Sequence, residues 1–337
     1  MNVFLCHPRR SAIGRLSSTL AGVRPDDLAA HILRAVLQEA PELDWVAIDE
    51  VMMGSVNQTG EDNRNVARMS ALLAVLPISV PGTTLNWLCG SGMDAVGTAF
   101  RAVRARELDL VLAGGVESMY RAPYVLGKAD SGFSRDQKIE DTNIGWRFVN
   151  PQMKEQYGID SMPETAESVA EQFNISREDQ NLFTFRSQQK ATREQQQGVF
   201  AQEIVPGSIP RRKQDPLVFD TDEYPRSTML EKLASLSTPF RENGCVTAGK
   251  ASGKASGVND DAAAMLVVSK AAVKQTQTRA HGEDPRHGSR WCGSSHYGYW
   301  ACACSTKTDG ETEYHHRRHR RDRAKRSLCR SRPGDFA

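Results

Sequence analysis

The chain has 337 residues, of which 39% are hydrophobic and 25% are charged, and its formal net charge at pH 7 is +2. This size and composition can bury one or two large cores, and they exclude a transmembrane protein, because no apolar run reaches the roughly 20 residues that span a bilayer. The first residues form no signal peptide and the seven cysteines have no regular early spacing, so we expect a cytoplasmic protein without a disulfide scaffold.

Short β-rich runs alternate with amphipathic helices through most of the chain. We expect strands at residues 1–6, 51–53 and 108–113, and helices that begin at Pro25 and Ser91, the second of which ends near Val103. The helix from Pro25 carries apolar side chains at helical spacing on one face and two aspartates in its first turn. Strands that alternate with helices predict an α/β fold with a largely parallel sheet.

The candidate nucleophile is Cys89, which lies in residues 86–95, of sequence NWLCGSGMDA. An extended run ends at this cysteine, a glycine-rich turn follows, and the helix from Ser91 begins. The free N–H groups and positive dipole end of a helix N-terminus favour a thiolate over a thiol, and glycines let an acyl group approach the sulfur. The local pattern alone does not separate this interpretation from a buried structural cysteine.

Residues 120–244 differ in character, with more glutamine, arginine and turn residues. Within this range, Ser176 followed by an acidic side chain at Asp179 predicts a capped helix that reaches about Gln196. The many polar side chains of this helix indicate a solvated face.

Residues 279–337 have the composition of a disordered tail. They contain 13 Lys and Arg and 7 Asp and Glu, and Leu328 is their only Leu, Ile, Val or Met, so they cannot form a hydrophobic core. Two alternatives give the tail a function. The basic run at 317–321 could contact nucleic-acid phosphates, and four side chains could bind zinc, namely Cys292, His296, Cys302 and Cys304. We expect neither nucleic acid nor metal, because the basic run is short and one residue between two cysteines is too close for a zinc pair.

Several motifs, in order, resemble those of the thiolases. Residues 10–15, RSAIGR, are similar to the family's opening RTPIGR, and residues 86–95 resemble its nucleophile turn. Residues 114–119, GGVESM, resemble the glycine pair that ends a strand beside the nucleophile, and residues 252–260 resemble a later Ala-Ser-Gly-x-Asn-Asp stretch. Motifs in this order and at this spacing are specific, although each alone would be weak.

Within the family, residues 61–68, 141–148 and 161–165 look most like the thiolases that act on β-ketoadipyl-CoA in aromatic degradation. The resemblance implies a thiolase fold, layered αβαβα, of which this chain has the N-terminal half and a loop domain while the C-terminal half is largely missing. The implied domains are an α/β domain in 1–119 and 245–274, a loop domain over the CoA site in 120–244, and a non-homologous, disordered tail in 275–337.

By the same resemblance, the chain cleaves a 3-oxoacyl-CoA, namely β-ketoadipyl-CoA, with CoA to give acetyl-CoA and succinyl-CoA. Cys89 would attack the 3-oxo carbon and hold the acyl group as a thioester until CoA takes it. Arg147, or else Arg121, could pair with the far carboxylate, although either arginine could instead be a surface or CoA-phosphate contact. CoA is a substrate, no separate cofactor is implied, and the family's dimers and tetramers imply a homodimer or homotetramer.

Three further residues match family positions that contact CoA. Met162 matches a position near the pantetheine, with a gap-filling loop methionine as the alternative. Ser252 and Ser256 compete for one CoA-contacting serine, because residues 250–253, KASG, are repeated at 254–257.

Residues 275–337 lack the family's Asn-Glu-Ala-Phe loop, its Gly-His-Pro histidine and its Cys-x-Gly cysteine. A general acid or base contributes roughly a hundredfold to ten-thousandfold, so we expect this chain to be impaired. Codons for residues 322–329 can encode Ile-Glu-Leu-Asn-Glu-Ala-Phe in a shifted frame, which suggests a frameshift near residue 277.

Two residues also depart from the family, since Trp87 replaces an arginine and Asp261 a glycine. The alternatives are a catalytically dead acyl-CoA-binding remnant, a short-chain acetoacetyl-CoA thiolase, and a condensing enzyme of the ketoacyl-synthase type.

Overall fold

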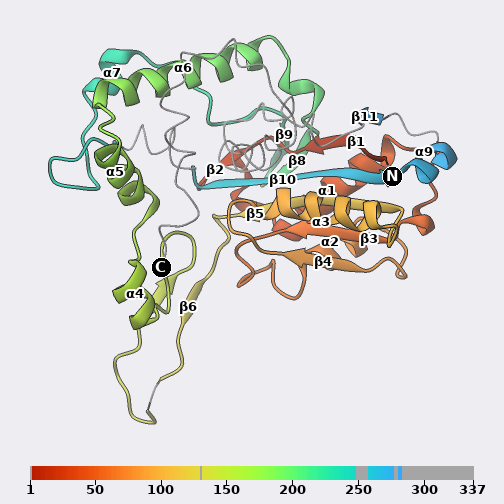
Figure 1. Ribbon diagram of the computed structural model, residues 1–337, viewed down its shortest axis with the longest axis horizontal. Coiled ribbons are helices and arrows are strands. Elements are labelled where there is room, and N and C mark those ends of the chain that lie inside the picture. Colours follow the sequence, from red (N-terminus) through yellow and green to blue (C-terminus); the bar gives the residue numbers. More distant parts are fainter. Residues whose placement is uncertain (1, 130, 248–256, 277–279, 283–337) are drawn as a thin grey trace. The chain divides into compact units, whose positions relative to one another are not determined.

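The computed structural model describes residues 2–129, 131–247, 257–276 and 280–282 (Figure 1). These residues divide into two compact units. The first unit contains the described residues within 1–157, 193–225 and 258–287, and the second contains those within 158–192, 226–257 and 288–337. No helix in the described ranges is both long enough and apolar enough to cross a bilayer. The domain boundaries expected from the sequence stay a prediction.

The first unit is built on a seven-stranded sheet in the order β11-β1-β10-β5-β3-β4, with β2 paired to β10. Its strands are β1 (Val3–Arg10), β2 (Gly14–Arg15), β3 (Glu50–Gly54), β4 (Gly82–Leu85), β5 (Leu110–Ser118), β10 (Asn259–Ser269) and β11 (Ala280–Gly282). Among the described residues β4 pairs only with β3, and it therefore forms one edge of the sheet.

The α/β class is confirmed, but the prediction of a largely parallel sheet is wrong. β3 is parallel to both β4 and β5, as expected for strands joined through helices. β10 lies between β5 and β1 and is antiparallel to both of them. The alternation of strands and helices does not predict the direction of a strand that returns to the sheet after residues 119–258. This strand, β10, makes the pairing at the centre of the sheet antiparallel.

Helices cover both faces of this sheet (Figure 1). α1 (Pro25–Gln38) and α2 (Val66–Leu73) pack on one face, and α3 (Ser91–Ala105) packs on the other. The predicted helix starts at Pro25 and Ser91 are confirmed. The core on the α1 face includes Leu28, Ile32, Leu33, Val36, Leu37, Leu112 and Leu266, and the core on the α3 face includes Met52, Ala95, Ala99, Val103, Val111 and Val267.

Two ribbons and several short elements complete the first unit. β6 (Tyr124–Leu126) pairs with β7 (Ile139–Asp141), and β8 (Gly207–Arg211) pairs with β9 (Gln214–Phe219). The remaining elements are the 3-10 helices η1 (Thr19–Gly22), η2 (Trp45–Ala47) and η3 (Phe200–Gln202) and the α-helices α4 (Pro151–Tyr157) and α9 (Lys270–Thr276).

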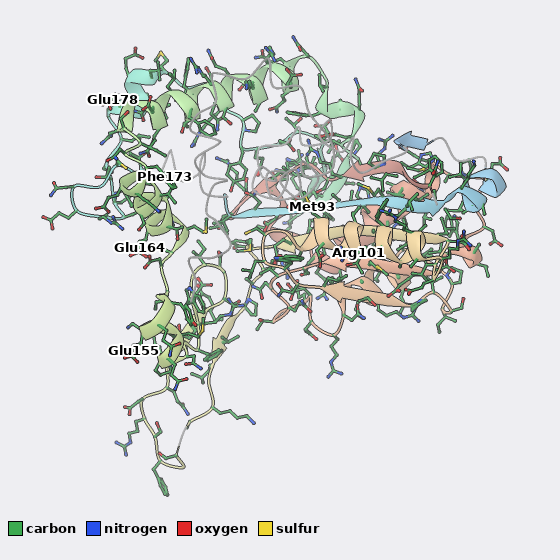
Figure 2. All side chains as sticks on the ribbon, viewed as in Figure 1. Met93, Arg101, Glu155, Glu164, Phe173 and Glu178 are labelled. Carbon is green, nitrogen blue, oxygen red and sulfur yellow. The ribbon has the colours of Figure 1, made fainter. Side chains whose placement is uncertain are left out.

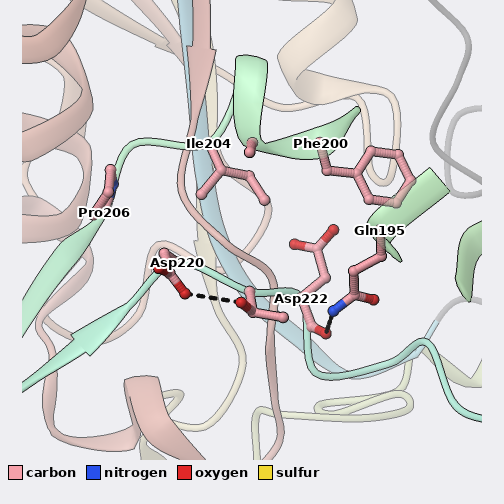
Figure 3. Close-up of a pocket in the computed structure, with 8 residues that line it drawn as sticks. Gln195, Phe200, Ile204, Pro206, Asp220 and Asp222 are labelled. Carbon is pink, nitrogen blue, oxygen red and sulfur yellow. Dashed lines mark hydrogen bonds between the residues drawn. The ribbon is translucent and has the colours of Figure 1, made fainter. Parts of the chain in front are cut away.

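A buried ion pair fastens the segment after β9 to β1. Asp222 is 7% exposed and accepts two hydrogen bonds from the Arg10 guanidinium, at 2.8 and 2.9 Å, and a third from the Ile13 N–H at 2.8 Å. Arg10 also donates to Glu203 at 2.7 Å and stacks over the Phe200 ring. This cluster borders a cavity of about 210 Å³ (Figure 3). Arg10 and Ile13 of the RSAIGR motif therefore hold the segment after β9 against the end of β1.

The second unit contains α5 (Met162–Gln172), the main part of α6 (Arg177–Gln196), and α7 (Leu230–Ala234). The predicted start of α6 is confirmed, because the Ser176 hydroxyl accepts the Asp179 N–H at 3.0 Å. Glu167 of α5 is buried and accepts the N–H groups of Cys245 and Val246 at 2.9 and 2.7 Å. These bonds fix the chain that leads toward residue 248.

Candidate functional site

Cys89 lies in the turn between the edge strand β4 and helix α3. It is exposed and forms no disulfide, and Gly90, which follows it, is the N-cap of α3. Leu88 has a φ of 47°, which is rare for a bulky side chain and marks a strained turn of the kind found at functional sites. The structure thus places this sulfur at the N-terminal end of a helix, and its part in catalysis stays a prediction.

Hydrogen bonds hold the Cys89 turn on both sides of the sulfur. The Ser91 hydroxyl accepts the Trp87 N–H at 2.8 Å and donates to the Leu88 carbonyl at 2.6 Å. The Asn86 side chain accepts the Leu88 N–H at 3.0 Å and donates to the Val56 carbonyl at 3.1 Å. The turn is therefore fixed internally and is also tied to the loop that follows β3.

Glycines let the first turn of α3 lie directly on the sheet. A Cβ on Gly54, the last residue of β3, would overlap the Ser91 carbonyl and the Gly92 nitrogen. A Cβ on Gly115 of β5 would lie 2.9 Å from the Gly92 Cα, closer than real side chains come. The absence of side chains at these positions sets the height of the helix N-terminus, and so of Cys89, above the strands.

Glu117 near the end of β5 holds the loop to which Asn86 is bound. Its carboxylate accepts the N–H of Val56 at 2.8 Å and the N–H of Asn57 at 3.0 Å. We call residues 55–58 the support loop. A carboxylate is a strong acceptor for two adjacent backbone N–H groups, so Glu117 fixes the path of the support loop beneath the Cys89 turn.

A second carboxylate lies opposite Glu117 on the neighbouring strand. Asp261 of β10 is in direct register with Glu117 of β5. Burial raises the pKa of Glu117 to about 7, against the two N–H groups that lower it, and the charges of Asp62 and Asp261 raise it further. Burial likewise raises the pKa of Asp261 to about 6, although the charge of Arg10 opposes the rise.

We expect Asp261→Asn to stabilise the protein at pH 8 by up to about 3 kcal/mol. The folded state raises the pKa of Asp261 from its ordinary 3.8 to about 6, so ionisation destabilises the fold. This penalty is absent below about pH 4, grows as pH rises through the range between these values, and is complete above it. Urea unfolding of both proteins at pH 4 and pH 8 measures the difference.

The matched control for this variant is Asp136→Asn at an exposed loop position. It should change the free energy of unfolding by less than about 0.5 kcal/mol at either pH. An equal gain for Asp261→Asn at pH 4 and pH 8 would mean that its charge carries no penalty.

Arg121 and Arg147 are the two candidates for binding the carboxylate of the acyl chain, and Arg121 is already paired with a carboxylate of the protein. The Arg121 guanidinium forms a double ion pair with Glu61 and also donates to the Ala21 carbonyl. Arg147 donates to the Thr142 carbonyl at 3.3 Å, and among the described residues no carboxylate pairs with it. Thr142 in turn accepts the Asn57 side-chain amide at 3.1 Å, which links Arg147 to the support loop.

The other predicted site residues fall in different parts of the chain. Met162 is 53% exposed and is the first residue of α5, in the second unit. Ser161 before it forms a capping box with Glu164, which Figure 2 labels. Ser252 and Ser256 lie outside the described residues, as do the basic run and the cysteine and histidine zinc candidates of the tail. Within the described ranges no three His, Cys, Asp or Glu side chains are grouped to hold a metal ion.

Sequence reasoning missed Glu117 and Asn57 as parts of the site. In the GGVESM motif the glycine pair carries the family resemblance, and the motif alone gives no role to Glu117. A carboxylate near the end of a buried strand, two residues after a glycine pair, was the available signal. Its partners lie about 60 positions away in the chain, so the pairing itself was not visible in the sequence.

Comparisons with known proteins agree on one family. Residues 3–271 match the model described as "Thiolase, N-terminal domain". The chain is 58% identical over 285 residues to the beta-ketoadipyl-CoA thiolase of Pseudomonas aeruginosa, covering 84% of this chain and 69% of that protein. It is 54% identical over 284 residues to the 3-oxoadipyl-CoA/3-oxo-5,6-dehydrosuberyl-CoA thiolase of Escherichia coli K12, with 84% and 69% of the two chains covered.

A solved structure gives the same result for the fold. The crystal structure of the Bacillus anthracis acetyl-CoA acetyltransferase is similar to this chain with a TM-score of 0.73 and 33% sequence identity. The match covers 83% of this chain and 68% of that one.

Proposed function

The chain belongs to the thiolase family of acyltransferases, and we propose that it transfers the acyl group of β-ketoadipyl-CoA through Cys89. The observation that carries this proposal is the exposed, disulfide-free Cys89 at the start of α3, in a turn held by Asn86 and Ser91. Relatives at 54–58% identity bear the name of this substrate, which supports the same substrate class for this chain.

In the proposed reaction the Cys89 thiolate attacks the 3-oxo carbon, and the bond between C2 and C3 of the acyl chain breaks. The C2 fragment takes a proton and leaves as acetyl-CoA, while the succinyl group stays on sulfur as a thioester. The thiol of a CoA molecule then attacks this thioester, which yields succinyl-CoA and returns Cys89 as a thiol. Backbone N–H groups at the start of α3 have no partner within the helix, so they are suitable donors for the oxygen on which charge develops.

Both halves of this reaction need a proton transfer, because the departing C2 fragment takes up a proton and the thiol of CoA gives one up. Residues 275–337 contain none of the family motifs that supply a histidine and a cysteine base. A missing general base slows a step by roughly a hundredfold or more. We therefore propose that this chain performs both acyl capture on Cys89 and the full turnover slowly.

Arg147 is the better candidate for the far carboxylate of a dicarboxylic acyl chain. Its guanidinium has no carboxylate partner among the described residues, whereas Arg121 is held by Glu61. A guanidinium that is not already paired with a carboxylate can bind one through two parallel hydrogen bonds. Met162 and one of Ser252 and Ser256 are proposed CoA contacts on the family resemblance alone.

The test is acyl capture measured by intact-protein and peptide mass spectrometry. Incubation with β-ketoadipyl-CoA should place about one succinyl group per chain on Cys89, faster than acetoacetyl-CoA places an acetyl group. Arg147→Gln should slow the first reaction about tenfold or more and leave the second unchanged, because only the longer acyl chain ends in a carboxylate. Arg101→Gln, at an exposed position on α3 (Figure 2), is the matched control and should change neither rate.

Three outcomes separate the alternatives. Faster capture from acetoacetyl-CoA would assign the chain to short-chain substrates. Label on Cys89 with release of acetyl-CoA but not of succinyl-CoA would indicate a chain that performs only the first half of the reaction. Absence of label on Cys89, in protein whose Cys89 still reacts with iodoacetamide, would reject acyl transfer.

Exposed apolar surfaces support a homodimer or homotetramer. The edge strand β4 lies near the exposed side chains of α2 and of the turn after it, which are Met69, Leu72, Leu73, Val75 and Ile78. The β6–β7 ribbon exposes a separate set, which is Tyr124, Leu126 and Ile139. Two distinct exposed apolar surfaces are consistent with a tetramer that has two kinds of interface. The odd number of cysteines, seven without a regular early spacing, supports a reducing compartment, and we propose the cytoplasm.

A further inference from the structure

Glu117 lies beyond the helix N-terminus on the face of the sheet that α3 covers. Successive residues of a strand point to opposite faces, so Ala113, Gly115 and Glu117 share one face of β5. Ala113 belongs to the core beneath α3, and Gly115 lies against Gly92 at the start of this helix. Glu117 is one step further along the same row, about 7 Å past Gly115. The proposed reaction leaves this carboxylate unused.

The carboxylate of Glu117 is joined to the Cys89 turn by an unbroken series of hydrogen bonds. It accepts the N–H groups of Val56 and Asn57. The carbonyl of Val56 accepts the side-chain amide of Asn86, and the other end of that amide accepts the Leu88 N–H. Val56 therefore connects the two groups, because its N–H donates to Glu117 and its carbonyl oxygen accepts from Asn86.

We propose that Glu117 is a positioning residue for Cys89, which acts by holding the support loop and, through Asn86, the turn that carries the sulfur. The proposal deepens the proposed function and rests on Cys89 as the reactive group. The ionised carboxylate offers both oxygens as acceptors to the two N–H groups. A protonated carboxyl has an O–H that donates, so it holds the loop less firmly.

The surroundings of Glu117 make this hold depend on pH. The charged groups that face it are Asp62, from the loop before α2, and Asp261, from β10. Asp261 itself faces Arg10, which favours its charge, and Asp222 and Asp260, which oppose it. Because burial and these carboxylates raise the pKa of Glu117 to about 7, the hold is complete above neutral pH and is lost as pH falls below it.

The experiment measures the rate at which iodoacetamide alkylates Cys89 between pH 5.5 and 8.5, by peptide mass spectrometry. At pH 8.5 we expect Glu117→Gln to react on the order of tenfold more slowly than the unchanged protein, since a charge-assisted hydrogen bond is lost. At pH 5.5 the two rates should converge, because the side chain at position 117 is then neutral in both proteins. Glu155→Gln, the same change at an exposed position on α4 (Figure 2), should match the unchanged protein throughout.

Asp261→Asn provides a second test that keeps Glu117 in place. Removal of the neighbouring negative charge lowers the pKa of Glu117, so the pH at which alkylation slows should move downward. Amide hydrogen exchange gives a third readout, because Glu117→Gln should speed exchange both in the support loop and in the Cys89 turn. Faster exchange in the loop alone would overturn the coupling between them.

The direction of the alkylation result distinguishes positioning from simple repulsion. If Glu117 acted on Cys89 only through its charge, Glu117→Gln would favour the thiolate and react faster, which would overturn the proposal. A constant ratio of rates at every pH would also overturn it, since a merely structural role has no step near neutral pH. Iodoacetamide needs neither CoA nor an acyl substrate, so this result stands apart from any failure of acyl capture.

Discussion

Gly54→Ala is expected to lower the free energy of unfolding of the first unit by about 3 kcal/mol and to slow the alkylation of Cys89. The added Cβ would overlap backbone atoms of Ser91 and Gly92, and backbone cannot rotate aside as a side chain can. The start of α3 must therefore lift from β3, and the turn that carries Cys89 moves with it. Urea unfolding and the rate of Cys89 modification by iodoacetamide measure the two effects.

Two other glycines serve as matched controls for this change. A Cβ on Gly22 meets nothing within 4 Å, so Gly22→Ala should alter stability by less than about 0.5 kcal/mol. Gly97 lies within α3, where its Cβ would meet only the flexible Arg101 guanidinium, at 3.4 Å. Gly97→Ala should stabilise the helix by roughly 0.5–1 kcal/mol. Equal destabilisation by all three changes would show that close packing at Gly54 is not the cause.

The parts of the fold that could be predicted are those that local pattern determines. The helix from Pro25 was predicted from the spacing of its apolar side chains, and the helix from Ser91 from the glycine-rich turn before it. Both signals lie within a few residues of the element that they predict. The same is true of the cap at Ser176, whose partner Asp179 is three positions away.

Contacts between distant segments could not be predicted in the same way. The direction of β10 depends on where the chain re-enters the sheet after residues 119–258, and strand periodicity is identical in both directions. The partner of Arg10 is Asp222, 212 positions away, and the partners of Glu117 precede it by about 60. For each of these side chains the sequence supplies the charge and the family motif, and only the fold supplies the partner.

The RSAIGR motif illustrates the difference most directly. Its sequence resembles the family's opening motif, and in the structure its residues hold distant segments of the chain together. Ser11 accepts the Ala262 N–H at 3.0 Å, which joins β10 to the start of the motif. Arg10 and Ile13 both donate to Asp222. The motif thus fixes the returning strand and the segment after β9 at one place.

Asp222→Ala is expected to destabilise the first unit by about 3–5 kcal/mol, because it leaves the buried Arg10 guanidinium without its main partner. The Arg10 side chain is 12% exposed, and Asp222 contributes two of its hydrogen bonds. Glu203 remains at 2.7 Å from the guanidinium but reaches only its Nε, so the two terminal nitrogens lose their carboxylate. Urea unfolding at pH 7 measures the loss.

Asp220→Ala is the matched control, since Asp220 lines the same cavity and undergoes the same chemical change (Figure 3). Asp220 is exposed and accepts a hydrogen bond from the adjacent Thr221 at 2.8 Å. Its removal should cost less than about 1 kcal/mol. If the two variants lose equal stability, the Arg10 pair is not what fastens this segment. If Asp222→Ala alone is destabilised but Arg10→Met with Asp222→Leu recovers most of the loss, the cost lies in the unpaired buried charge rather than in the removal of a favourable pair.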